Sequence, residues 1–511
     1  MTSTLSQVAS ALAPCEPRGA DVTLVDATHD SRAVVPGALF CAIPGARADG
    51  HDHAGQACER GASALLVERW LDVELPQLRV PSVRAAAGPA AAVVHEQPSQ
   101  ALRVVGITGT NGKTTTAYLL EAAFAAAGRH AGIIGTVETR IDGEAQPGVR
   151  TTPEGPDLQR LLARMRDRGV DLVAMEVSSH GLAMHRVDGT RFAVAVYTNL
   201  SRDHLDFHGT MEAYHAAKAR LFTPALAEQG VVLLDGPWAL RLLERATIPV
   251  VTVGRGPGAN GVPELVSDLV PDVVLEDERV DVHGGRARLR SDRLDLDVEV
   301  VIRLPGRFNL DNAALALVAA VQAGLPIDAS LAGLAACPGA PGRLERVEAG
   351  QPYPVLVDYA HTPDAVAKTL ASVRALLKPA GRLIVVLGCG GDRDRDKRGP
   401  MGAAAAQGAD LAVLTSDNPR SEDPRAILDA VVAGARDAVA VGAGARLHVE
   451  IDRRTAIGHA LERAEPEDAV VIAGKGHEAV QELADRVVPF DDRVVAAEWL
   501  AAAAGEWGRP T

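Results

Sequence analysis

The stretch VVGITGTNGKTTTAYLLEAAF, from Val104 to Phe124, carries the strongest structural signal in the chain. An apolar run leads into a glycine-rich turn, which is followed by a lysine, three threonines and a helical pattern. Gly109 and Gly112 let backbone N–H groups approach phosphate oxygens without a Cβ in the way. The helix adds the positive end of its dipole. The stretch therefore predicts a strand, a phosphate-binding loop and a helix.

The loop departs from the strict GxxxxGK[ST] pattern at one position. Ile107 stands where that pattern has its first glycine, so the chain has the form GxxGxxGKT. Lys113 can reach terminal phosphates, and the Thr114 hydroxyl can reach Mg²⁺. The alternative is a glycine turn with an incidental lysine. We favour a nucleotide-phosphate site, because strand, turn and helix occur in order.

Composition restricts the class of protein. A chain of 511 residues is too long to fold around a single hydrophobic core, so we expect two to four domains. A net charge of −14 disfavours nucleic acid or an anionic membrane as a partner. No apolar run reaches the roughly 20 residues of a membrane helix, and we expect no signal peptide. Five scattered cysteines fit a reducing cytoplasm.

The chain divides into three predicted α/β blocks. We expect domains at residues 1–100, 101–338 and 339–511, with the Pro- and Gly-containing stretch ACPGAPGR between the last two. Near-continuous apolar runs alternate with helical patterns in the second and third blocks, which indicates parallel strands buried on both faces. Ligands of such sheets collect beyond the carboxyl ends of the strands. Three polar motifs of the central block should therefore share one edge.

Two of these motifs suggest metal chemistry. Glu176 ends the run DLVAMEV, where a carboxylate can face Mg²⁺ and phosphates. The motif DHLDFHG places His204, Asp206 and His208 two residues apart. Zinc is the alternative there, but neither HExxH nor a cysteine partner is present. One histidine at an Mg²⁺ site, with the others structural, fits better.

Other polar groups have ordinary alternatives. Lys218 lies on a predicted helix, where its spacing alone suggests a snorkelling surface lysine. The motif SDNPR is consistent with a plain turn. It also suits an amino acid, since Arg420 can clamp a carboxylate and Asp417 can pair with an ammonium. Glu478, in GKGHE, is another candidate for an ammonium.

The motifs together resemble the Mur ligase family. The matching stretches occur in the family's order over about 450 residues: GTNGKTTT, TTPE, MEVSSHGL, TNLSRDHLDFHG, YHAAKARLF, GRFNLDNAALAL, VDYAHTPD and GCGGDRDRDKR. The resemblance is strongest to the branch that adds the third residue of the peptidoglycan stem peptide. It implies three domains: a UDP-sugar-binding domain, a central P-loop domain with a parallel sheet, and a Rossmann-like domain that binds the amino acid.

The resemblance implies a reaction and partners. ATP would phosphorylate the D-glutamate γ-carboxylate of UDP-N-acetylmuramoyl-L-alanyl-D-glutamate, and the amine of the incoming amino acid would displace phosphate. Thr114 and Glu176 would hold one Mg²⁺, His204 would help to hold a second, and Lys218, carbamylated by CO₂, would orient Mg²⁺. We expect a cytoplasmic monomer in cell-wall synthesis, with neither nucleic-acid binding nor membrane insertion.

The resemblance also assigns the binding residues. The implied catalytic residues are Lys113, Glu176, His204 and Lys218. The implied ATP contacts are Gly109, Thr110, Asn111, Gly112, Lys113, Thr114, Thr115, Asn312, Arg343 and Asp358. Contacts to the UDP-sugar peptide would come from Ser31, the 46–48 turn, Thr151, Thr152, Ser178 and Arg186. The amino-acid pocket would comprise Arg393, Asp417, Asn418, Pro419, Arg420, Gly474 and Glu478.

The DNPR form resembles family members that select meso-2,6-diaminopimelate over L-lysine. Diaminopimelate has a second carboxylate for Arg420, whereas lysine would leave this arginine unpaired. The chain departs from known family forms at Arg150, where asparagine can occur, and at Met184, where glutamine can occur.

Several alternative functions remain at this stage. Within the superfamily they are an L-lysine-adding ligase, a D-alanyl-D-alanine-adding ligase and a folylpolyglutamate synthase. From other classes they are a P-loop ATPase that drives a conformational change in a partner, and a metal hydrolase built on HLDFH.

Overall fold

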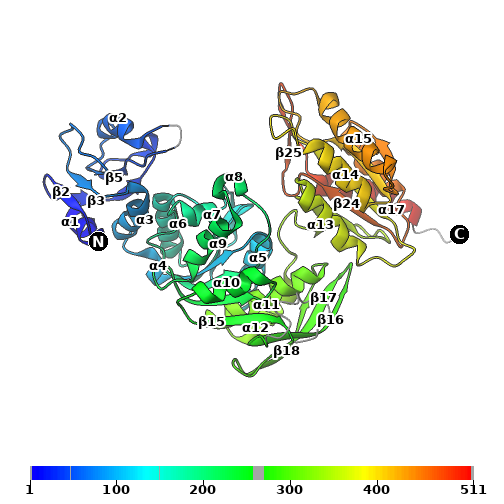
Figure 1. Ribbon diagram of the computed structural model, residues 1–511, viewed down its shortest axis with the longest axis horizontal. Coiled ribbons are helices and arrows are strands. Elements are labelled where there is room, and N and C mark those ends of the chain that lie inside the picture. The colour runs from blue at the N-terminus through cyan, green and yellow to red at the C-terminus, as the bar shows by residue number, and fades with distance from the viewer. Residues whose placement is uncertain (1–2, 46–47, 149, 257–269, 508–511) are drawn as a thin grey trace. The chain divides into compact units, whose positions relative to one another are not determined.

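The computed structural model describes residues 3–45, 48–148, 150–256 and 270–507, and it is an α/β structure with three principal sheets (Figure 1). The α/β class predicted from the alternating pattern is confirmed. Among the helices described, none combines the length and apolar character needed to cross a membrane.

Contacts divide the chain into two compact units. The first comprises Met1–Glu276, Arg288–Val300 and Asp311–Cys337; the second comprises Asp277–Ala287, Val301–Leu310 and Pro338–Thr511. The first unit therefore contains both the N-terminal sheet and most of the central sheet. The boundaries expected at residues 100 and 338 stay a prediction.

The N-terminal sheet has five strands in the order β2-β7-β6-β5-β4. Strands β4 to β7 pair in parallel, and β2 joins the edge antiparallel. Apolar side chains on its two faces enter two separate cores. The elements of this region are β1 (Ser3–Thr4), α1 (Leu5–Ala11), β2 (Glu16–Arg18), β3 (Thr23–Leu24), β4 (Asp26–Thr28), η1 (Ser31–Ala33), β5 (Ala38–Cys41), η2 (Gly50–His53), α2 (Ala54–Glu59), β6 (Ala64–Val67), β7 (Gln77–Arg79), α3 (Val83–Val94) and α4 (Pro98–Ala101).

The central sheet runs in the order β11-β10-β9-β12-β8-β13-β14-β15-β16-β17-β18. Strand β8 lies between β12 and β13 and is parallel to both. The motifs after these three strands therefore share one sheet edge, as predicted. The strands are β8 (Arg103–Thr108), β9 (Ala131–Ile134), β10 (Glu138–Ile141), β11 (Glu144–Pro147), β12 (Leu172–Glu176), β13 (Phe192–Tyr197), β14 (Ala227–Leu233), β15 (Val250–Arg255), β16 (Val273–Asp281), β17 (Gly284–Ser291) and β18 (Leu296–Ile302).

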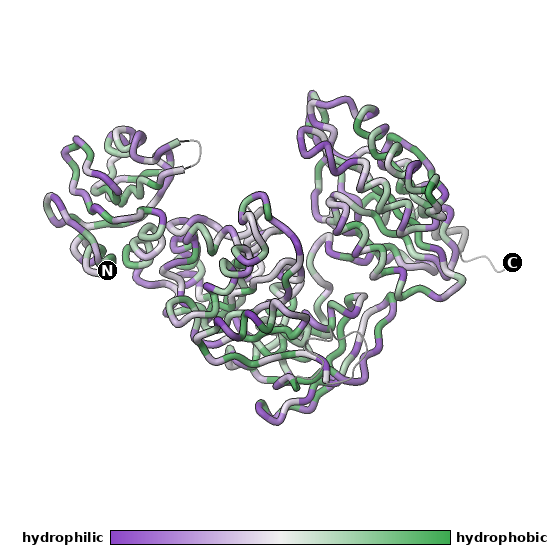
Figure 2. Tube along the Cα trace, in the orientation of Figure 1, coloured by the Kyte–Doolittle hydropathy of each residue, from purple (hydrophilic) through white to green (hydrophobic). Residues whose placement is uncertain are grey.

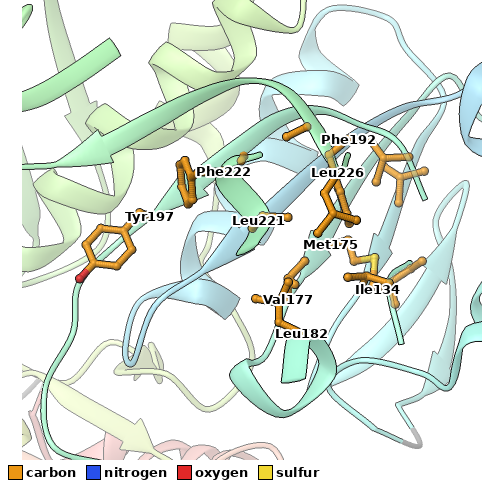
Figure 3. Close-up of a cluster of buried hydrophobic side chains, with 14 of the residues drawn as sticks. Ile134, Met175, Val177, Leu182, Phe192, Tyr197, Leu221, Phe222 and Leu226 are labelled. Atoms are coloured by element: carbon orange, nitrogen blue, oxygen red, sulfur yellow. The ribbon is translucent and has the colours of Figure 1, made fainter. Parts of the chain in front are cut away.

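Helices cover the middle of this sheet, because its strands β8, β9, β12 and β13 are buried on both faces, whereas β17 alternates between buried and exposed residues. One face packs against α6, α7, α9 and α10 around a core that includes Met175, Phe192 and Phe222 (Figure 3). Helix α5 packs on β8, β9 and β12, and α12 packs on α5. The helices are α5 (Lys113–Ala126), α6 (Gly155–Asp167), α7 (Ser179–Ala183), α8 (Leu205–His208), α9 (Met211–Ala219), α10 (Pro237–Arg245), α11 (Arg307–Gln322) and α12 (Ile327–Ala336), with η3 (Arg220–Phe222) after α9.

The sheet of the second unit has the order β19-β20-β24-β21-β22-β23, parallel except for β19. Helices α13 to α15 contribute to the core on one face, and α16 and α17 to the core on the other, which makes the sheet doubly wound. Its inner strands are largely hydrophobic in Figure 2. The elements are β19 (Glu345–Arg346), β20 (Val355–Asp358), α13 (Pro363–Arg374), β21 (Leu383–Cys389), α14 (Arg398–Gly408), β22 (Leu411–Ser416), α15 (Pro424–Ala440), β23 (Arg446–Val449), α16 (Arg453–Glu462), β24 (Ala469–Ala473), β25 (Val480–Glu482), β26 (Val487–Pro489) and α17 (Asp492–Trp507).

Candidate active site

The predicted phosphate loop connects β8 to α5 and depends on two glycines. Gly109 has φ +148° and Gly112 has φ +87°, in the region that favours glycine. A Cβ on Gly109 would lie 1.9 Å from Thr198 Oγ1, and one on Gly112 would lie 2.4 Å from Asn312 Oδ1. The loop therefore needs both glycines to fit its neighbours. Asn312, a predicted ATP contact, packs directly against the loop.

Neighbouring polar groups fix the rest of the loop. The Thr110 hydroxyl lies 3.1 Å from the Tyr214 hydroxyl. The Asn111 backbone N–H donates to Asn199 Oδ1 at 3.0 Å. The first turn of α5 then presents Lys113, Thr114 and Thr115. These braces hold the backbone of the loop in place, as a phosphate site requires.

Two lysines meet at one carbonyl of this loop. Lys113 Nζ donates to Gly109 O at 2.9 Å, and Lys218 Nζ donates to the same oxygen at 2.8 Å. Lys218 is fully buried on α9, with its Nζ 4.6 Å from the ring centre of Tyr214. Burial, together with the nearby Lys113 charge, lowers the Lys218 pKa well below its ordinary value. The interpretation of Lys218 as a surface lysine is wrong.

Glu176 ends β12 at the same sheet edge. Its side chain is buried, and its Oε1 accepts a hydrogen bond from the Thr136 backbone N–H at 2.9 Å. The Thr136 hydroxyl donates to Glu176 Oε2 at 3.1 Å and lies 2.9 Å from the Thr151 hydroxyl. The buried carboxylate of Glu176 thus lies beside β8, the strand that leads into the loop. Thr136 connects it to Thr151, which is predicted to contact the sugar-peptide substrate.

His204 lies in a cluster of aromatic rings that follows β13. Its ring packs edge-on against His180, with the centroids 4.8 Å apart. Burial is the main cause that lowers the pKa of His180, and the nearby His204 lowers it further. His208 Nε2 lies 3.0 Å from Ser179 Oγ. Within the described part of the chain, no three His, Cys, Asp or Glu side chains are grouped as a metal site, and the choice between zinc and Mg²⁺ at this motif stays a prediction.

The residues predicted to contact the sugar peptide form a connected group. The Thr152 hydroxyl lies 3.1 Å from the Ser178 hydroxyl and accepts the Ser178 backbone N–H at 3.0 Å. Arg186 donates to the Thr152 carbonyl at 3.3 Å and pairs with Glu154 at 2.9 Å. Burial lowers the pKa of Arg186. Met184 Sδ accepts from Arg186 Nη2 at 3.3 Å, in the place where a glutamine can occur in the family.

The predicted uridine residues lie in the N-terminal sheet region. The Ser31 hydroxyl is buried and donates to Gln56 Oε1 at 2.6 Å. Residues 46–47 lie outside the described residues. Ala48 O accepts from the Gly45 N–H at 2.9 Å.

The other predicted ATP contacts, Arg343 and Asp358, belong to the second unit, whereas Asn312 belongs to the first. The Arg343 guanidinium lies 5.0 Å from the centre of the Tyr359 ring. Asp358 accepts the Leu344 and Ala360 N–H groups, each at 2.9 Å. Burial raises the Asp358 pKa, and Arg343 opposes that rise.

The residues predicted to bind the amino acid lie at the carboxyl ends of β22 and β24. Asn418 Nδ2 donates to Glu478 Oε2 at 2.7 Å. A Cβ on Gly474 would lie 2.7 Å from Asp417 Oδ2, so the two strand ends approach closely. Asp417 and Asn418 are both buried. Residues of two distant motifs therefore form one polar group, as predicted.

Arg420 extends this group toward the loop after β21. Its Nη1 donates to Gly391 O at 2.9 Å, and its Nε donates to Glu482 Oε2 at 2.6 Å. A Cβ on Gly391 would lie 1.9 Å from Pro419 O, which requires glycine there. Arg393 lies exposed on the same loop.

Two further residues, Lys475 and Glu482, contact this polar group and were not predicted from the sequence. Lys475 is fully buried, and its Nζ donates to Asn418 Oδ1 at 3.1 Å and lies 3.4 Å from Glu478 Oε2. It is one of six lysines in an arginine-rich chain, which was the available signal. Glu482 carries no such signal.

A buried ion pair contacts the ends of the two strands that carry this polar group. Arg453 on α16 and Asp492 on α17 are both inaccessible to solvent and form two hydrogen bonds, of 2.8 and 2.6 Å. Arg453 also donates to Ser416 O at 3.3 Å and to Ala473 O at 3.0 Å. These carbonyls immediately precede Asp417 and Gly474, so the pair ties the ends of β22 and β24 together.

Comparison with known proteins covers almost the whole chain. Three family models match: "Mur ligase family, catalytic domain" at residues 27–110, "Mur ligase middle domain" at 107–320, and "Mur ligase, glutamate ligase domain" at 342–476. A protein of Streptomyces avermitilis named UDP-N-acetylmuramoyl-L-alanyl-D-glutamate–2,6-diaminopimelate ligase is 48% identical over 503 residues, 97% of this chain and 96% of its own. A Geobacillus thermodenitrificans protein of the same name is 43% identical over 490 residues, 94% of this chain and 95% of its own.

Solved structures agree with these matches. One titled as a UDP-N-acetylmuramoyl-L-alanyl-D-glutamate–2,6-diaminopimelate ligase has a TM-score of 0.71 and 32% identity, over 99% of this chain and all of its own. A MurF ligase from Thermotoga maritima in complex with ADP has a TM-score of 0.58 and 20% identity, over 93% of this chain and 96% of its own, and it shares the fold. The predicted three-domain α/β fold is confirmed.

Proposed function

This chain belongs to the Mur ligase family, and from that premise we propose that it joins meso-2,6-diaminopimelate to UDP-N-acetylmuramoyl-L-alanyl-D-glutamate at the expense of ATP. The new amide bond forms at the D-glutamate γ-carboxylate. The product would be the UDP-linked tripeptide of peptidoglycan synthesis.

The observation that carries the proposal is the polar group at the carboxyl ends of β22 and β24. Asp417, Asn418, Arg420 and Glu478 bring both signs of charge together there. An amino acid has a carboxylate and an amine that match such a group. A nucleotide hydrolase that acts only on a partner protein does not require this pocket.

The reaction proceeds in two steps with balanced atoms. The γ-carboxylate oxygen attacks the γ-phosphorus of ATP, which forms an acyl phosphate and releases ADP. The amine nitrogen then attacks the acyl carbon, loses a proton, and displaces orthophosphate. The enzyme contributes by positioning the reactants and by stabilising the charge that develops.

The first unit holds the groups suited to phosphate transfer. The loop from Gly109 to Thr115 presents backbone N–H groups, and Lys113, whose Nζ donates to Gly109 O, would donate to a phosphate oxygen when ATP is bound. Thr114 and Glu176 offer the oxygen ligands that Mg²⁺ prefers, and His204 would complete its surroundings. When bound, Mg²⁺ would neutralise phosphate charge.

We assign Lys218 the role of a carbamate. Its lowered pKa favours the neutral amine, whose nitrogen can attack CO₂ and lose a proton. The resulting anion would sit beside Lys113 and supply oxygens towards the metal. Arginine could not replace this residue.

The setting follows from the substrates. ATP and a UDP-linked sugar peptide are cytoplasmic compounds, so we place the enzyme in the cytoplasm. We also propose that it acts as a monomer and serves cell-wall growth and division. Arg420 would favour diaminopimelate over L-lysine, because lysine lacks the far carboxylate.

One reaction mixture tests the proposal. Purified protein is incubated with ATP, Mg²⁺, UDP-N-acetylmuramoyl-L-alanyl-D-glutamate and meso-diaminopimelate, and the product mass is measured. We expect the tripeptide, and one ¹⁸O atom transferred from labelled γ-carboxylate to orthophosphate. Turnover with L-lysine alone would contradict the specificity, and ATP hydrolysis independent of both acceptors would indicate the ATPase alternative.

A further inference from the structure

The turn formed by residues 185–189 follows α7 and carries Arg186, one of the predicted sugar-peptide contacts. His185, its first residue, has φ +56°, a left-handed conformation that non-glycine residues keep only when their surroundings hold it. The Arg186 N–H donates to Gly181 O at 2.8 Å, so the turn folds back on α7. The place of the Arg186 side chain therefore depends on the contacts that hold this turn.

Helix α3 packs against one side of the turn, backbone to backbone. A Cβ on Gly88 of α3 would lie 2.1 Å from Asp188 O. A Cβ on Gly189, which has φ +86°, would lie 2.7 Å from Pro89 N. Neither glycine leaves room for a side chain, so the turn cannot move towards α3.

Arg220, directly after the end of α9, holds the turn on another side. Its Nη1 donates to Leu182 O, and its Nη2 donates to Asp188 Oδ1 and Oδ2 at 3.0 and 3.1 Å. Nη2 also lies 3.2 Å from His185 Nδ1, and that nitrogen lies 2.6 Å from Asp188 Oδ2. One guanidinium therefore joins the end of α9 to α7 and to the turn.

The surroundings of this contact are partly buried. The Arg220 side chain is 33% exposed and that of Asp188 19%, so salt screens the pair less than it screens a pair on the open surface. Leu182 and Leu221, which lie next to the contact in the chain, belong to the same apolar cluster (Figure 3). The guanidinium thus acts between two segments that are already packed together.

We propose that Arg220 is a positioning residue for the ligase reaction: it fixes the turn that carries Arg186 relative to the helix that carries Lys218. This inference rests on the proposed function. Lys218, two residues before Arg220, donates to Gly109 O of the phosphate loop at 2.8 Å. The D-glutamate carboxylate must meet the γ-phosphate of ATP, so the segments that bind the two reactants must keep a fixed separation. Arg220 acts through these segments and not on a reactant itself.

Removing the guanidinium should affect the two substrates unequally. We expect Arg220→Ala to raise KM for UDP-N-acetylmuramoyl-L-alanyl-D-glutamate about fivefold or more and to lower kcat about tenfold or more, because small displacements of reacting groups are costly. KM for ATP should stay within about twofold, since Asn199 and Tyr214 still brace the phosphate loop. Arg220→Lys keeps the charge but not the planar fork, so both of its constants should fall between those of Arg220→Ala and the wild type.

Asp188→Asn tests the same contact from its other side. It should raise KM for the sugar peptide about threefold or more, and it carries the test if Arg220→Ala does not fold. The double variant should be no more than about twofold worse than Arg220→Ala alone, because both changes act through one contact. Independent effects that multiply would overturn the proposal.

Arg191→Ala is the matched control, three positions after Asp188. Arg191 pairs with Glu228 at 2.8 Å, but both side chains are well exposed, so all kinetic constants should stay within about twofold. Equal rises in KM for ATP and for the sugar peptide in Arg220→Ala, or unchanged kinetics, would overturn the positioning role. Wild-type protein that ligates no diaminopimelate would instead contradict the proposed function itself.

Discussion

At the scale of single residues, Lys218 is the most unusual group in the first unit. A lysine is seldom fully buried, and this one shares Gly109 O with a second lysine. Two ammonium groups at one carbonyl repel each other. The lowered pKa of Lys218 favours its neutral amine and so reduces this repulsion. A carbamate would remove it by replacing one positive charge with a negative one.

We expect Lys218→Ala to lower kcat at least a hundredfold, because the metal-orienting oxygens are lost. Added acetate or formate should restore part of the rate by occupying the vacated space. Steady-state kinetics with and without the acids give the measurement. Intact mass of the wild type in bicarbonate should show an added CO₂.

Lys368→Ala is the control for this experiment. Lys368 lies half-exposed on α13 and pairs with Asp364 at 2.7 Å. Its loss should leave kcat unchanged and should give no response to acetate. Full activity of Lys218→Ala without rescue acid would disprove the carbamate role.

Asp235 provides a pH-dependent prediction with a definite sign. Burial raises its pKa to about 7, above the ordinary value of about 3.9 in an unfolded chain. The folded state therefore binds the proton more tightly, and ionisation destabilises the fold increasingly from about pH 4 to pH 7. Asp235→Asn should raise Tm at pH 8, and this gain should shrink towards zero at pH 4.

Asp297 is the control for this experiment, because its pKa is lowered rather than raised. The hydrogen bond from Arg288 lowers the pKa of the exposed Asp297 carboxylate, so this group stabilises the fold above its ordinary pKa. Asp297→Asn should therefore raise Tm at no pH. Thermal unfolding of both variants across pH 4–8 distinguishes these cases, and a pH-independent gain for Asp235→Asn would contradict the assignment.

At the scale of elements, the loop between β8 and α5 can be tested through its glycines. Gly109→Ala combines an unfavourable φ with a Cβ only 1.9 Å from Thr198 Oγ1, so the loop must move. We expect the thermal shift produced by ATP and Mg²⁺ to disappear. Gly128→Ala, after α5, meets nothing within 4 Å and has φ +70°. It should cost about 1 kcal/mol of stability and keep the ATP shift.

The sequence predicted elements well where periodicity was strong. Apolar runs such as RLIVVLGC became β21, whose residues are all buried, and the glycine turn followed β8 as expected. The edge shared by three motifs followed from parallel pairing. These features depend on local pattern, which a single sequence contains.

Contacts between distant segments were less predictable. Glu482 meets Arg420 across 62 positions, from a three-residue strand without an apolar pattern. The Arg453–Asp492 pair is buried even though the sequence shows two ordinary charged residues. Burial of a charge depends on which helices meet, and periodicity does not specify that. The motif residues were found, but the residues that support them were not.

At the scale of the whole molecule, two compact units predict two separable unfolding processes. Asp492→Asn leaves Arg453 without its anionic partner in the second unit and should cost about 3–5 kcal/mol. Hydrogen exchange should accelerate in β20–β24, while peptides covering β8 and β12 keep their protection.

Glu498→Gln is the matched control on the same two helices. Its partner Arg454 lies at 2.6 Å, but both side chains are about half exposed. Its loss should cost less than about 1 kcal/mol. Equal acceleration in both units after Asp492→Asn would mean that the chain unfolds as one cooperative body.

The hairpin of β25 and β26 adds no strand to the doubly wound sheet, although one of its side chains reaches the DNPR motif. The sequence of this three-residue segment can therefore change while the hydrophobic interior of the sheet stays intact. Alternative hairpins grafted onto this chain should therefore leave the fold unchanged, and such chimaeras would show which properties depend on the hairpin alone.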